Sequence, residues 1–265
     1  MANSSSHVDF LGRAVHIPNE PQRIVSLCPS QTELLFDLGL GERIVGRTRW
    51  CIHPKEQIDK IESVGGTKNP DPDKIRLLKP DLILCEKEEN TAQFVTLMEK
   101  EFPVYVTDVR NILSAMRMIL IVGELTGKQK EALELSVAIS TALHQVEHPG
   151  RQIKVAYLIW KKPWMAVGAD TYINSVLSHL GFENVFSSHT SRYPEFSEAE
   201  LAALDPDMVF LSSEPFPFSE KHIADLNLLL PGTPVRLVDG EMFSWYGSRM
   251  LKACSYFKEW VKTLP

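Results

Sequence analysis

The stretch from Asn111 to His148, NILSAMRMILIVGELTGKQKEALELSVAISTALHQVEH, predicts two consecutive helices. Gly127 predicts the end of the first helix, because glycine takes the left-handed cap conformation without steric cost. The second helix is expected from Lys128 to His148, and its length of about 30 Å can carry the chain from one lobe to another. Apolar residues recur at the three-or-four spacing of a buried helix face, at Ile112, Met116, Ile119, Ala132, Leu135, Ile139, Ala142 and Val146.

Strands alternate with helices on both sides of this stretch. The expected strands include residues 23–27, 42–46, 81–85 and 103–106 before it, and 154–160, 207–211 and 235–238 after it. Strands separated by helices imply parallel pairing. The sequence therefore predicts an α/β protein of two α/β lobes with mainly parallel sheets, joined by a long backbone helix. The expected domains are an N-terminal lobe (1–110), a helical connector (111–150) and a C-terminal lobe (151–265).

Local signals predict several boundaries. Gly12 predicts the turn of an N-terminal hairpin, and Asp71 predicts the cap of a short helix at Pro72. Ser30, three residues before Glu33, predicts the cap of a helix over 31–38. Residues 240–245 are expected to form a loop and 246–262 the last helix. The phrase Pro-Asp followed by a buried strand occurs at Pro80 and again at Pro206, which is weak internal repetition.

Composition narrows the class of partner. The 265 residues carry a formal charge of −6 with a pI near 5.8, which does not favour nucleic acid or an anionic membrane as partner. No window approaches eighteen uncharged apolar residues, and the first residues lack the pattern of a secretory signal. The sequence as it stands thus leaves two locations open, the cytoplasm or a compartment reached with a signal that has been removed. Four cysteines are too few and too irregularly spaced for a disulfide scaffold.

Ligand sites of open parallel sheets lie beyond the carboxyl ends of the strands. In the N-terminal lobe this rule selects residues 28–30, 49–53 and 85–88 as one candidate surface. Cys28, Cys51 and Cys85 all follow strands, and the bland interpretation is buried, inert thiols. The alternative is a soft transition-metal site that includes Cys51 and His53, although Cys-x-His alone is a weak motif. Glu86, with its neighbours Glu88 and Glu89, is most simply a solvated face.

Three segments resemble one known family. Residues 23–35 (RIVSLCPSQTELL), 79–83 (KPDLI) and 181–186 (GFENVF) resemble, in order and spacing, the solute-binding proteins of ABC importers for cobalamin and iron-siderophores. The resemblance runs from about Phe10 to the C-terminal helix. It implies two α/β lobes on a helical backbone with the ligand in a cleft between them.

The resemblance also implies ligand-contacting residues, because the family covers its ligand with aromatic rings. Trp50 stands where cobalamin binders have a tyrosine, Tyr193 where they have a tryptophan, and Trp164 or Met165 near a phenylalanine. Glu86 replaces a tryptophan of the cobalamin site, and Leu180 replaces a cysteine of the family's disulfide. These two departures weaken the assignment of cobalamin itself. The candidate ligand-binding residues are Pro29, Trp50, His53, Glu86, Trp164, Tyr193, Trp245, Tyr246 and Arg249.

The family docks on its permease through one carboxylate from each lobe, and the matching positions are Asp73 and, within one residue, Glu200. The implied function is a non-catalytic, periplasmic or membrane-associated receptor for cobalamin or another metal chelate, without a resident cofactor and acting as a monomer. An ABC permease is the implied partner. The alternative is a cytoplasmic metal-binding protein or metalloenzyme. Against an enzyme, the sequence offers no nucleophile-base arrangement, phosphate loop or dinucleotide fingerprint.

Overall fold

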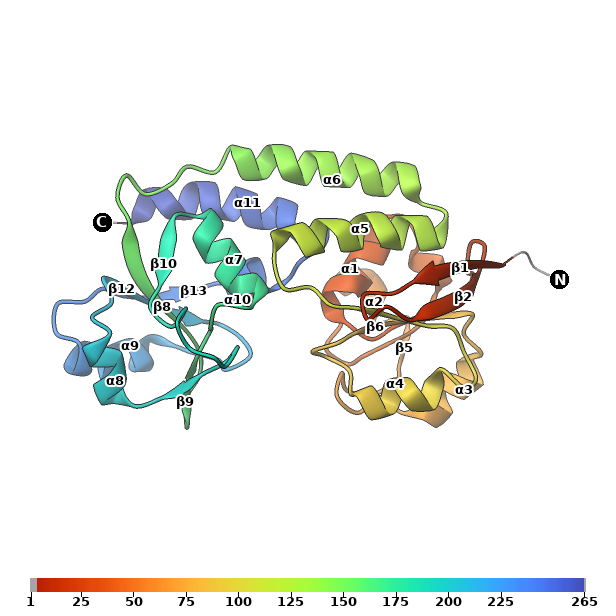
Figure 1. Cartoon of the computed structure of the whole chain (residues 1–265), viewed down its shortest axis with the longest axis horizontal. Coiled ribbons are helices and arrows are strands. Elements are labelled where there is room, and N and C mark those ends of the chain that lie inside the picture. Colours follow the sequence, from red (N-terminus) through yellow and green to blue (C-terminus); the bar gives the residue numbers. More distant parts are fainter. Residues whose placement is uncertain (1–3, 265) are drawn as a thin grey trace. The chain divides into compact units, whose positions relative to one another are not determined.

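The computed structural model describes residues 4–264 and divides into two compact units (Figure 1). Unit 1 comprises the chain up to Val109 together with Leu113–Ser140 and Tyr246–Arg249, and unit 2 comprises the remainder. The residues of the predicted connector are thus shared between the two units. The expectation about a signal at the N-terminus falls partly on residues 1–3, which lie outside the described residues.

Unit 1 contains a five-stranded parallel sheet in the order β5-β4-β3-β6-β7, preceded by the antiparallel hairpin β1-β2. The strands are β1 (Ser4–Val8), β2 (Ala14–Pro18), β3 (Ile24–Ser26), β4 (Ile44–Arg47), β5 (Glu62–Ser63), β6 (Leu82–Glu86) and β7 (Val104–Thr107). The helices are α1 (Pro29–Asp37), α2 (Lys55–Ile58), α3 (Pro72–Leu78), α4 (Ala92–Met98), α5 (Ile112–Thr126) and α6 (Gln129–His144), with a 3₁₀ turn at Gly41–Arg43. The first residue of α5 and the last four residues of α6 belong to unit 2.

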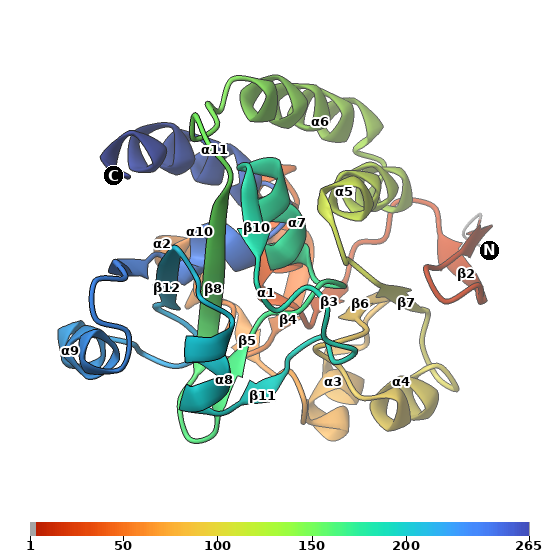
Figure 2. The same ribbon diagram turned by 60° about the vertical axis from the view of Figure 1, so that its left-hand side comes forward.

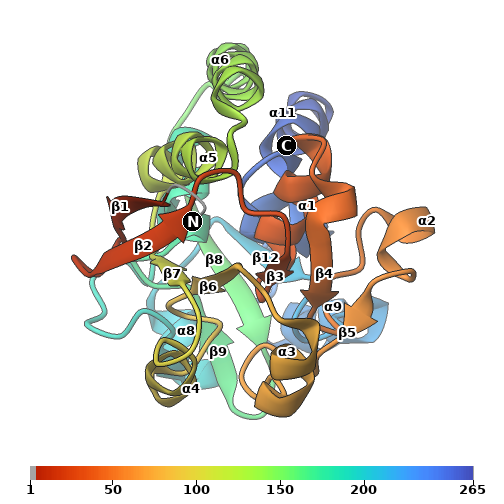
Figure 3. The same ribbon diagram turned by 90° about the vertical axis from the view of Figure 1, so that its right-hand side faces the viewer.

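The sheet of unit 1 is covered on both faces, since α3 and α4 lie on one side and α1 and α5 on the other (Figure 3). Val25, Ile83 and Cys85 point into the same apolar core as Ile75 of α3 and Met98 of α4. Their neighbours in sequence, such as Ser26 and Leu84, are also fully buried and point to the opposite face. Burial on both faces explains why β3, β6 and β7 are almost continuously apolar.

Unit 2 contains a mixed sheet in which β8 pairs in parallel with both β10 and β12 (Figure 2). β13 extends the parallel part, and β9 and β11 form an antiparallel edge, so the order is β11-β9-β8-β12-β13. The strands are β8 (Ile153–Trp160), β9 (Trp164–Ala166), β10 (Phe182–Asn184), β11 (Glu195–Phe196), β12 (Met208–Ser212) and β13 (Val235–Val238). The helices are α7 (Tyr172–His179), α8 (Glu198–Ala203), α9 (Glu220–Leu229), α10 (Gly240–Ser244) and α11 (Arg249–Trp260), followed by a 3₁₀ turn at Val261–Thr263.

The two faces of this second sheet have different cores. Leu158 and Val209 pack with Leu201 of α8 and Leu226 of α9. On the other face, Phe210 meets Phe243 of α10 and Trp260 of α11, with ring centroids 6.5 and 5.1 Å apart. Val209 and Phe210, which are neighbours on β12, therefore point into two different cores on opposite faces of the sheet.

The repeated Pro-Asp phrase has the same local structure in both units. Lys79 and Asp205 precede the phrase, and both adopt a left-handed backbone with φ of 46°. The Asp81 carboxylate then accepts hydrogen bonds from the backbone N–H groups of Gln22 and Arg23, and Asp207 accepts one from Lys154. In each unit the aspartate joins its own strand to the start of the neighbouring strand. The internal repetition is therefore structural.

The central helices follow the sequence prediction closely at their junction. Gly127 has φ of +73°, as expected of a glycine that ends a helix. At Gly123 a Cβ atom would lie 2.3 Å from that of Ala132, so glycine is needed where α5 and α6 approach each other. α6 ends at His144, four residues earlier than predicted. The proline at position 149 disfavours helical backbone before it. In the last turn of α6, the Leu143 carbonyl oxygen lies 3.2 Å from Nε2 of the His179 ring.

Other sequence predictions of local structure were wrong. The cap of α1 is Cys28 and no side-chain cap bond forms, so Ser30 lies inside the helix. Residues 240–244 form α10, with Asp239 as its cap, where a loop was expected. α11 begins at Arg249, not at Tyr246. Helix α9 was not predicted. Among residues 4–264, no helix is both long and apolar enough to cross a bilayer.

Candidate ligand-binding site

The carboxyl ends of the parallel strands in unit 1 bring several predicted site residues to one edge of the sheet. Pro29 follows β3, Trp50 follows β4, and Glu86 is the last residue of β6. Because all these strands run in the same direction, their carboxyl ends share one edge.

Trp50 is the exposed aromatic residue of this edge, with 57% of its surface accessible. The preceding residue, Arg49, donates its backbone N–H to the Gly65 carbonyl at 2.8 Å. The guanidinium carbon of Arg49 lies 5.6 Å from the centre of the Trp50 ring, within the range of a cation–π contact. Gly66 makes room for this arginine, because a Cβ there would lie 3.0 Å from its Nη2 atom. The backbone before the ring is thus fixed while the ring itself is available to a ligand.

Pro29 is half-buried at the first position of α1, where a missing N–H has no consequence. The preceding Cys28 is buried, and its sulfur lies 3.4 Å from the Tyr246 hydroxyl. Burial, followed by the nearby charges of Glu89 and Glu86, raises the pKa of the Cys28 thiol well above its ordinary value. Tyr246 is itself buried, so in this structure its ring belongs to the interior of unit 1.

Glu86 is 2% exposed, so the interpretation of this residue as part of a solvated face was wrong. Its carboxylate accepts backbone hydrogen bonds from Glu88 at 2.6 Å, Glu89 at 3.2 Å and Val109 at 3.3 Å. Loss of hydration on burial raises the pKa of Glu86 to about 7, and the hydrogen bonds from Glu88 and Val109 oppose this shift. Both carboxylate oxygens are therefore used to hold the backbone.

Arg249 is buried and forms a bidentate ion pair with Glu33 of α1, with nitrogen–oxygen distances of 2.7 and 2.9 Å. Arg249, a candidate ligand-binding residue from the sequence, therefore lies in the interior of unit 1.

The predicted alternative metal site does not assemble as a cluster. Cys51 is buried, and its sulfur contacts the hydroxyl groups of Thr32 and Thr48 at 3.1 and 3.2 Å. Burial raises the pKa of this thiol, which disfavours the thiolate that a metal requires. His53 is half-buried. Within residues 4–264, no group of three or more His, Cys, Asp or Glu side chains is placed to hold a metal ion.

The predicted site residues of unit 2 are less exposed than Trp50. Trp164 is half-buried and stacks with Phe196 and Phe218, with ring centroids 6.3 and 6.2 Å away. Tyr193 is also half-buried, with the Arg192 guanidinium 6.0 Å from its ring centre. Trp245 is 7% exposed, and its indole N–H donates to the Glu214 carboxylate at 2.9 Å. Within unit 2 these rings all have packing partners.

The two predicted docking carboxylates lie at the beginnings of short helices. Asp73 is in the first turn of α3, its side chain is 87% exposed, and it pairs with Arg76 at 2.7 Å. Glu200 is in the first turn of α8 and is partly exposed, 3.2 Å from the His189 ring.

Sequence reasoning missed the roles of three polar residues: Glu33, which is buried in α1, Asn90, which is buried after β6, and Glu214, which is half-buried after β12. Glu33 was assigned only a capping role. Asn90 could have been noticed as a polar residue four positions after Glu86 in an otherwise charged loop. Glu214 lies two residues after β12 and accepts hydrogen bonds from both Ser244 and Trp245, and burial raises its pKa.

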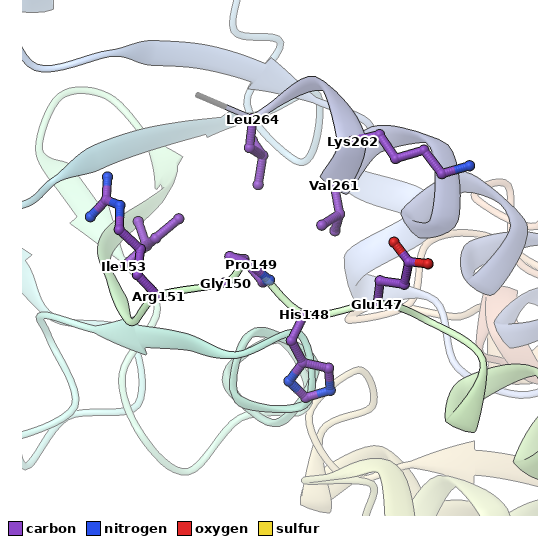
Figure 4. A pocket seen from close by; sticks show the side chains of 9 residues that line it. All are labelled: Glu147, His148, Pro149, Gly150, Arg151, Ile153, Val261, Lys262 and Leu264. Atoms are coloured by element: carbon purple, nitrogen blue, oxygen red, sulfur yellow. The ribbon is translucent and has the colours of Figure 1, made fainter.

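A separate hollow of about 460 Å³ lies in unit 2, between residues 147–151, the start of β8 and the end of the chain (Figure 4). The predicted site residues do not line it. Its cations already have carboxylate neighbours, since Lys262 lies 3.0 Å from Glu259 and Arg151 lies 4.0 Å from Asp207. Because both cations are already paired with carboxylates, the hollow is a poor candidate for binding an anion.

Comparison with known proteins defines the class. Residues 24–225 match the periplasmic binding protein family, and the chain belongs to this family. The vitamin B12-binding protein of Pectobacterium carotovorum is 24% identical over 241 residues, which cover 88% of this chain and 86% of that protein. An uncharacterized ABC transporter substrate-binding lipoprotein of Bacillus subtilis, YvrC, is 28% identical over 212 residues, which cover 76% of this chain and 67% of that protein.

Solved structures support the same fold. The periplasmic vitamin B12-binding protein BtuF of Vibrio cholerae aligns with a TM-score of 0.78 at 21% identity, covering 92% of this chain and 98% of BtuF. The periplasmic heme-binding protein HutB of Vibrio cholerae aligns with a TM-score of 0.78 at 18% identity, covering 91% of this chain and 98% of HutB. The predicted fold class and the family resemblance are confirmed.

Proposed function

We propose that this protein is the solute-binding receptor of an ABC importer and that its ligand is a bulky planar or macrocyclic metal chelate, such as cobalamin, haem or an iron-siderophore. The observation that carries the proposal is the exposed Trp50 ring at the carboxyl edge of the parallel sheet, in a chain of the periplasmic binding protein family. A large ring offers apolar contact area with few torsions to order on binding, which suits a flat or macrocyclic ligand.

The relatives support this ligand class in two ways. The named B12-binding relatives align over most of the chain, and structural neighbours include both B12-binding and heme-binding proteins. Glu86 adds a reason to test haem and siderophores beside cobalamin, because this position departs from the cobalamin pattern and its carboxylate is occupied by backbone N–H groups. A receptor of this kind works outside the cytoplasm or at the membrane, delivers its ligand to a permease and catalyses no reaction.

The test uses purified full-length protein in native mass spectrometry and absorbance titrations. Cyanocobalamin, haemin, a ferric hydroxamate siderophore, a ferric catecholate siderophore and bare Co²⁺, Zn²⁺ and Fe³⁺ are the probes. We expect one chelate to bind in a one-to-one complex with a shifted absorbance spectrum. Binding of a bare ion with no chelate bound would instead favour the metal-binding alternative. Failure of every chelate and ion would remove the proposed ligand class.

A further inference from the structure

Asn90 connects three segments of unit 1 through one buried side chain. It is 4% exposed and follows β6 by four residues. Its amide oxygen accepts the Glu86 backbone N–H at 2.9 Å. Its amide nitrogen donates to the Thr67 carbonyl at 2.8 Å and to the Leu27 carbonyl at 3.3 Å. One amide group thus fixes the end of β6, the residue after β3, and the loop that follows β5.

Two of these segments lead directly to candidate ligand-binding residues. Leu27 lies two positions before Pro29. Thr67 lies in the loop that contains Gly65, whose carbonyl accepts the backbone N–H of Arg49, the residue before Trp50. A path of hydrogen bonds and short stretches of backbone therefore runs from Asn90 to the exposed ring.

The carboxylate of Glu86 adds the fourth segment. It accepts the Val109 N–H after β7 and the N–H groups of Glu88 and Glu89 in its own turn. Asn90 in turn holds the backbone of Glu86, so the two side chains act on one turn. Hydrogen bonds from these two side chains therefore join the ends of β3, β6 and β7 and the loop after β5.

We propose that Asn90, supported by Glu86, is the positioning residue of this strand-end surface and holds the backbone from which Pro29 and Trp50 meet the ligand. The role in ligand binding rests on the proposed function. The hub itself, meaning the hydrogen bonds that the Asn90 and Glu86 side chains make to the four segments, does not depend on that function. Asparagine suits the role because one planar group both accepts and donates. An aspartate of the same shape keeps the acceptor oxygen but cannot donate. The buried carbonyl oxygens of Leu27 and Thr67 would then lose the hydrogen bonds that the Asn90 amide gives them.

The deciding variant is Asn90→Asp, and the matched control is Asn19→Asp. Asn19 is exposed in unit 1 and its amide oxygen accepts a hydrogen bond from the Ser5 hydroxyl at 2.8 Å, which an aspartate also accepts, so the control introduces the same charge without removing the hub. Full-length protein carrying 5-fluorotryptophan is observed by fluorine NMR, and Trp50→Phe assigns the Trp50 resonance. We expect Asn90→Asp to shift or broaden the Trp50 resonance and to leave that of Trp260, which packs in unit 2, unchanged. The control should leave both resonances as in the parent.

Acidification supplies a rescue. A protonated carboxyl regains one O–H donor. As pH falls, the Trp50 resonance of Asn90→Asp should therefore move toward the position that it has in the parent at the same pH. Where a chelate binds the parent, its affinity for Asn90→Asp should fall by at least about tenfold at neutral pH and recover in acid. Should Asn90→Asp not fold, the uncharged Asn90→Ser takes its place in the neutral-pH comparison.

The outcomes separate this inference from the function on which it builds. If no chelate binds the parent but the Trp50 resonance responds as expected, the proposed function fails and the hub stands. If a chelate binds but the Trp50 resonance and the affinity are unchanged in the Asn90 variant, the hub is overturned and the function stands. An equal disturbance at Trp260 would indicate general loosening and would also overturn the positioning role.

Discussion

The Arg249 guanidinium holds the Glu33 carboxylate in a buried bidentate ion pair, at 2.7 and 2.9 Å, across 216 residues of sequence. The segment Tyr246–Arg249 belongs to unit 1, although the chain on both sides of it belongs to unit 2. At Gly247, where φ is +81°, a Cβ would lie 3.4 Å from the Ser30 carbonyl oxygen, so this segment is in van der Waals contact with α1. The ion pair fixes one end of the segment and the Tyr246–Cys28 contact the other.

Removing Arg249 alone should strongly destabilise the protein. Arg249→Met leaves the Glu33 carboxylate buried without its cation, and breaking a buried pair in this way typically costs about 3–5 kcal/mol. The double variant Glu33→Leu with Arg249→Met should recover much of that loss, because no buried charge remains. Urea unfolding of the parent, both variants and the exposed control Lys262→Met would measure this. Equal stabilities of the single variant and the parent would contradict the role of the pair.

Glu86 should make stability fall as pH rises through the acid range. Its folded-state pKa of about 7 lies above the ordinary value of 4.5, so the carboxyl is protonated in both states below about pH 4.5 and contributes nothing there. Between these values the unfolded state loses its proton more readily, and the unfolding free energy decreases until the pH exceeds about 7. The whole effect is at most about 3 kcal/mol, since one pKa unit is worth about 1.4 kcal/mol.

This pH effect is measured as the difference between the parent and Glu86→Gln, because other groups titrate in both proteins and cancel. Denaturant unfolding at several pH values between about 4 and 8 gives the difference. The unfolding free energy of the parent minus that of the variant should decrease as pH rises. A difference that increases with pH would mean that the ionised carboxylate is favoured in the folded state, and the raised pKa would be wrong.

Trp50→Ala should weaken binding of a true chelate ligand by more than tenfold. A central aromatic anchor typically contributes at least about 2 kcal/mol when truncated to alanine. Leu228→Ala is the control, since Leu228 is 84% exposed on α9 of unit 2. The affinities come from absorbance titration with the chelate that binds the parent. An unchanged affinity in Trp50→Ala would place the ligand away from this edge.

Asp73→Ala and Glu200→Ala should impair association with the permease and leave ligand affinity unchanged. Both carboxylates are accessible in the first turns of short helices, where they can meet arginines of a partner. Pull-down or surface plasmon resonance against the cognate permease in nanodiscs would compare these variants with Glu101→Ala, which removes another Arg76-paired carboxylate. Loss of ligand affinity to the same extent as permease association would place these residues in the ligand site instead.

The double variant Cys51→Ser, His53→Ala should retain any bound metal ion as well as the parent. Burial raises the pKa of the Cys51 thiol, and its neighbours are threonine hydroxyls, so forming a thiolate there is unfavourable. Titration with Co²⁺, followed by thiolate charge-transfer absorption, gives the measurement. If the parent shows this absorption and the double variant loses it, the metal-site alternative returns.

The sequence by itself determined the family and the order of the elements apart from the unpredicted helices α9 and α10. The apolar run of β6, the Asp71 cap of α3 and the glycine at the end of α5 are all signals carried by a few neighbouring residues. Such signals act through local backbone preference and through burial of whole strands, so they survive without knowledge of the rest of the chain. The short helix α10 was missed for the converse reason, because its five residues contain no repeated apolar spacing.

Only the tertiary structure decided what the polar residues do. Glu86 and Arg249 were candidate ligand-binding residues, yet both are buried and bonded to partners from other segments. Trp50 and Trp245 are the same residue type, and the sequence alone does not distinguish their environments. Trp50 is exposed, whereas Trp245 is buried and donates a hydrogen bond to Glu214 within unit 2. Sequence spacing records which residues share a strand or a helix face. The environment of a charge or a ring depends on segments that fold against it from far along the chain, and these partners set its burial, its hydrogen bonds and its pKa.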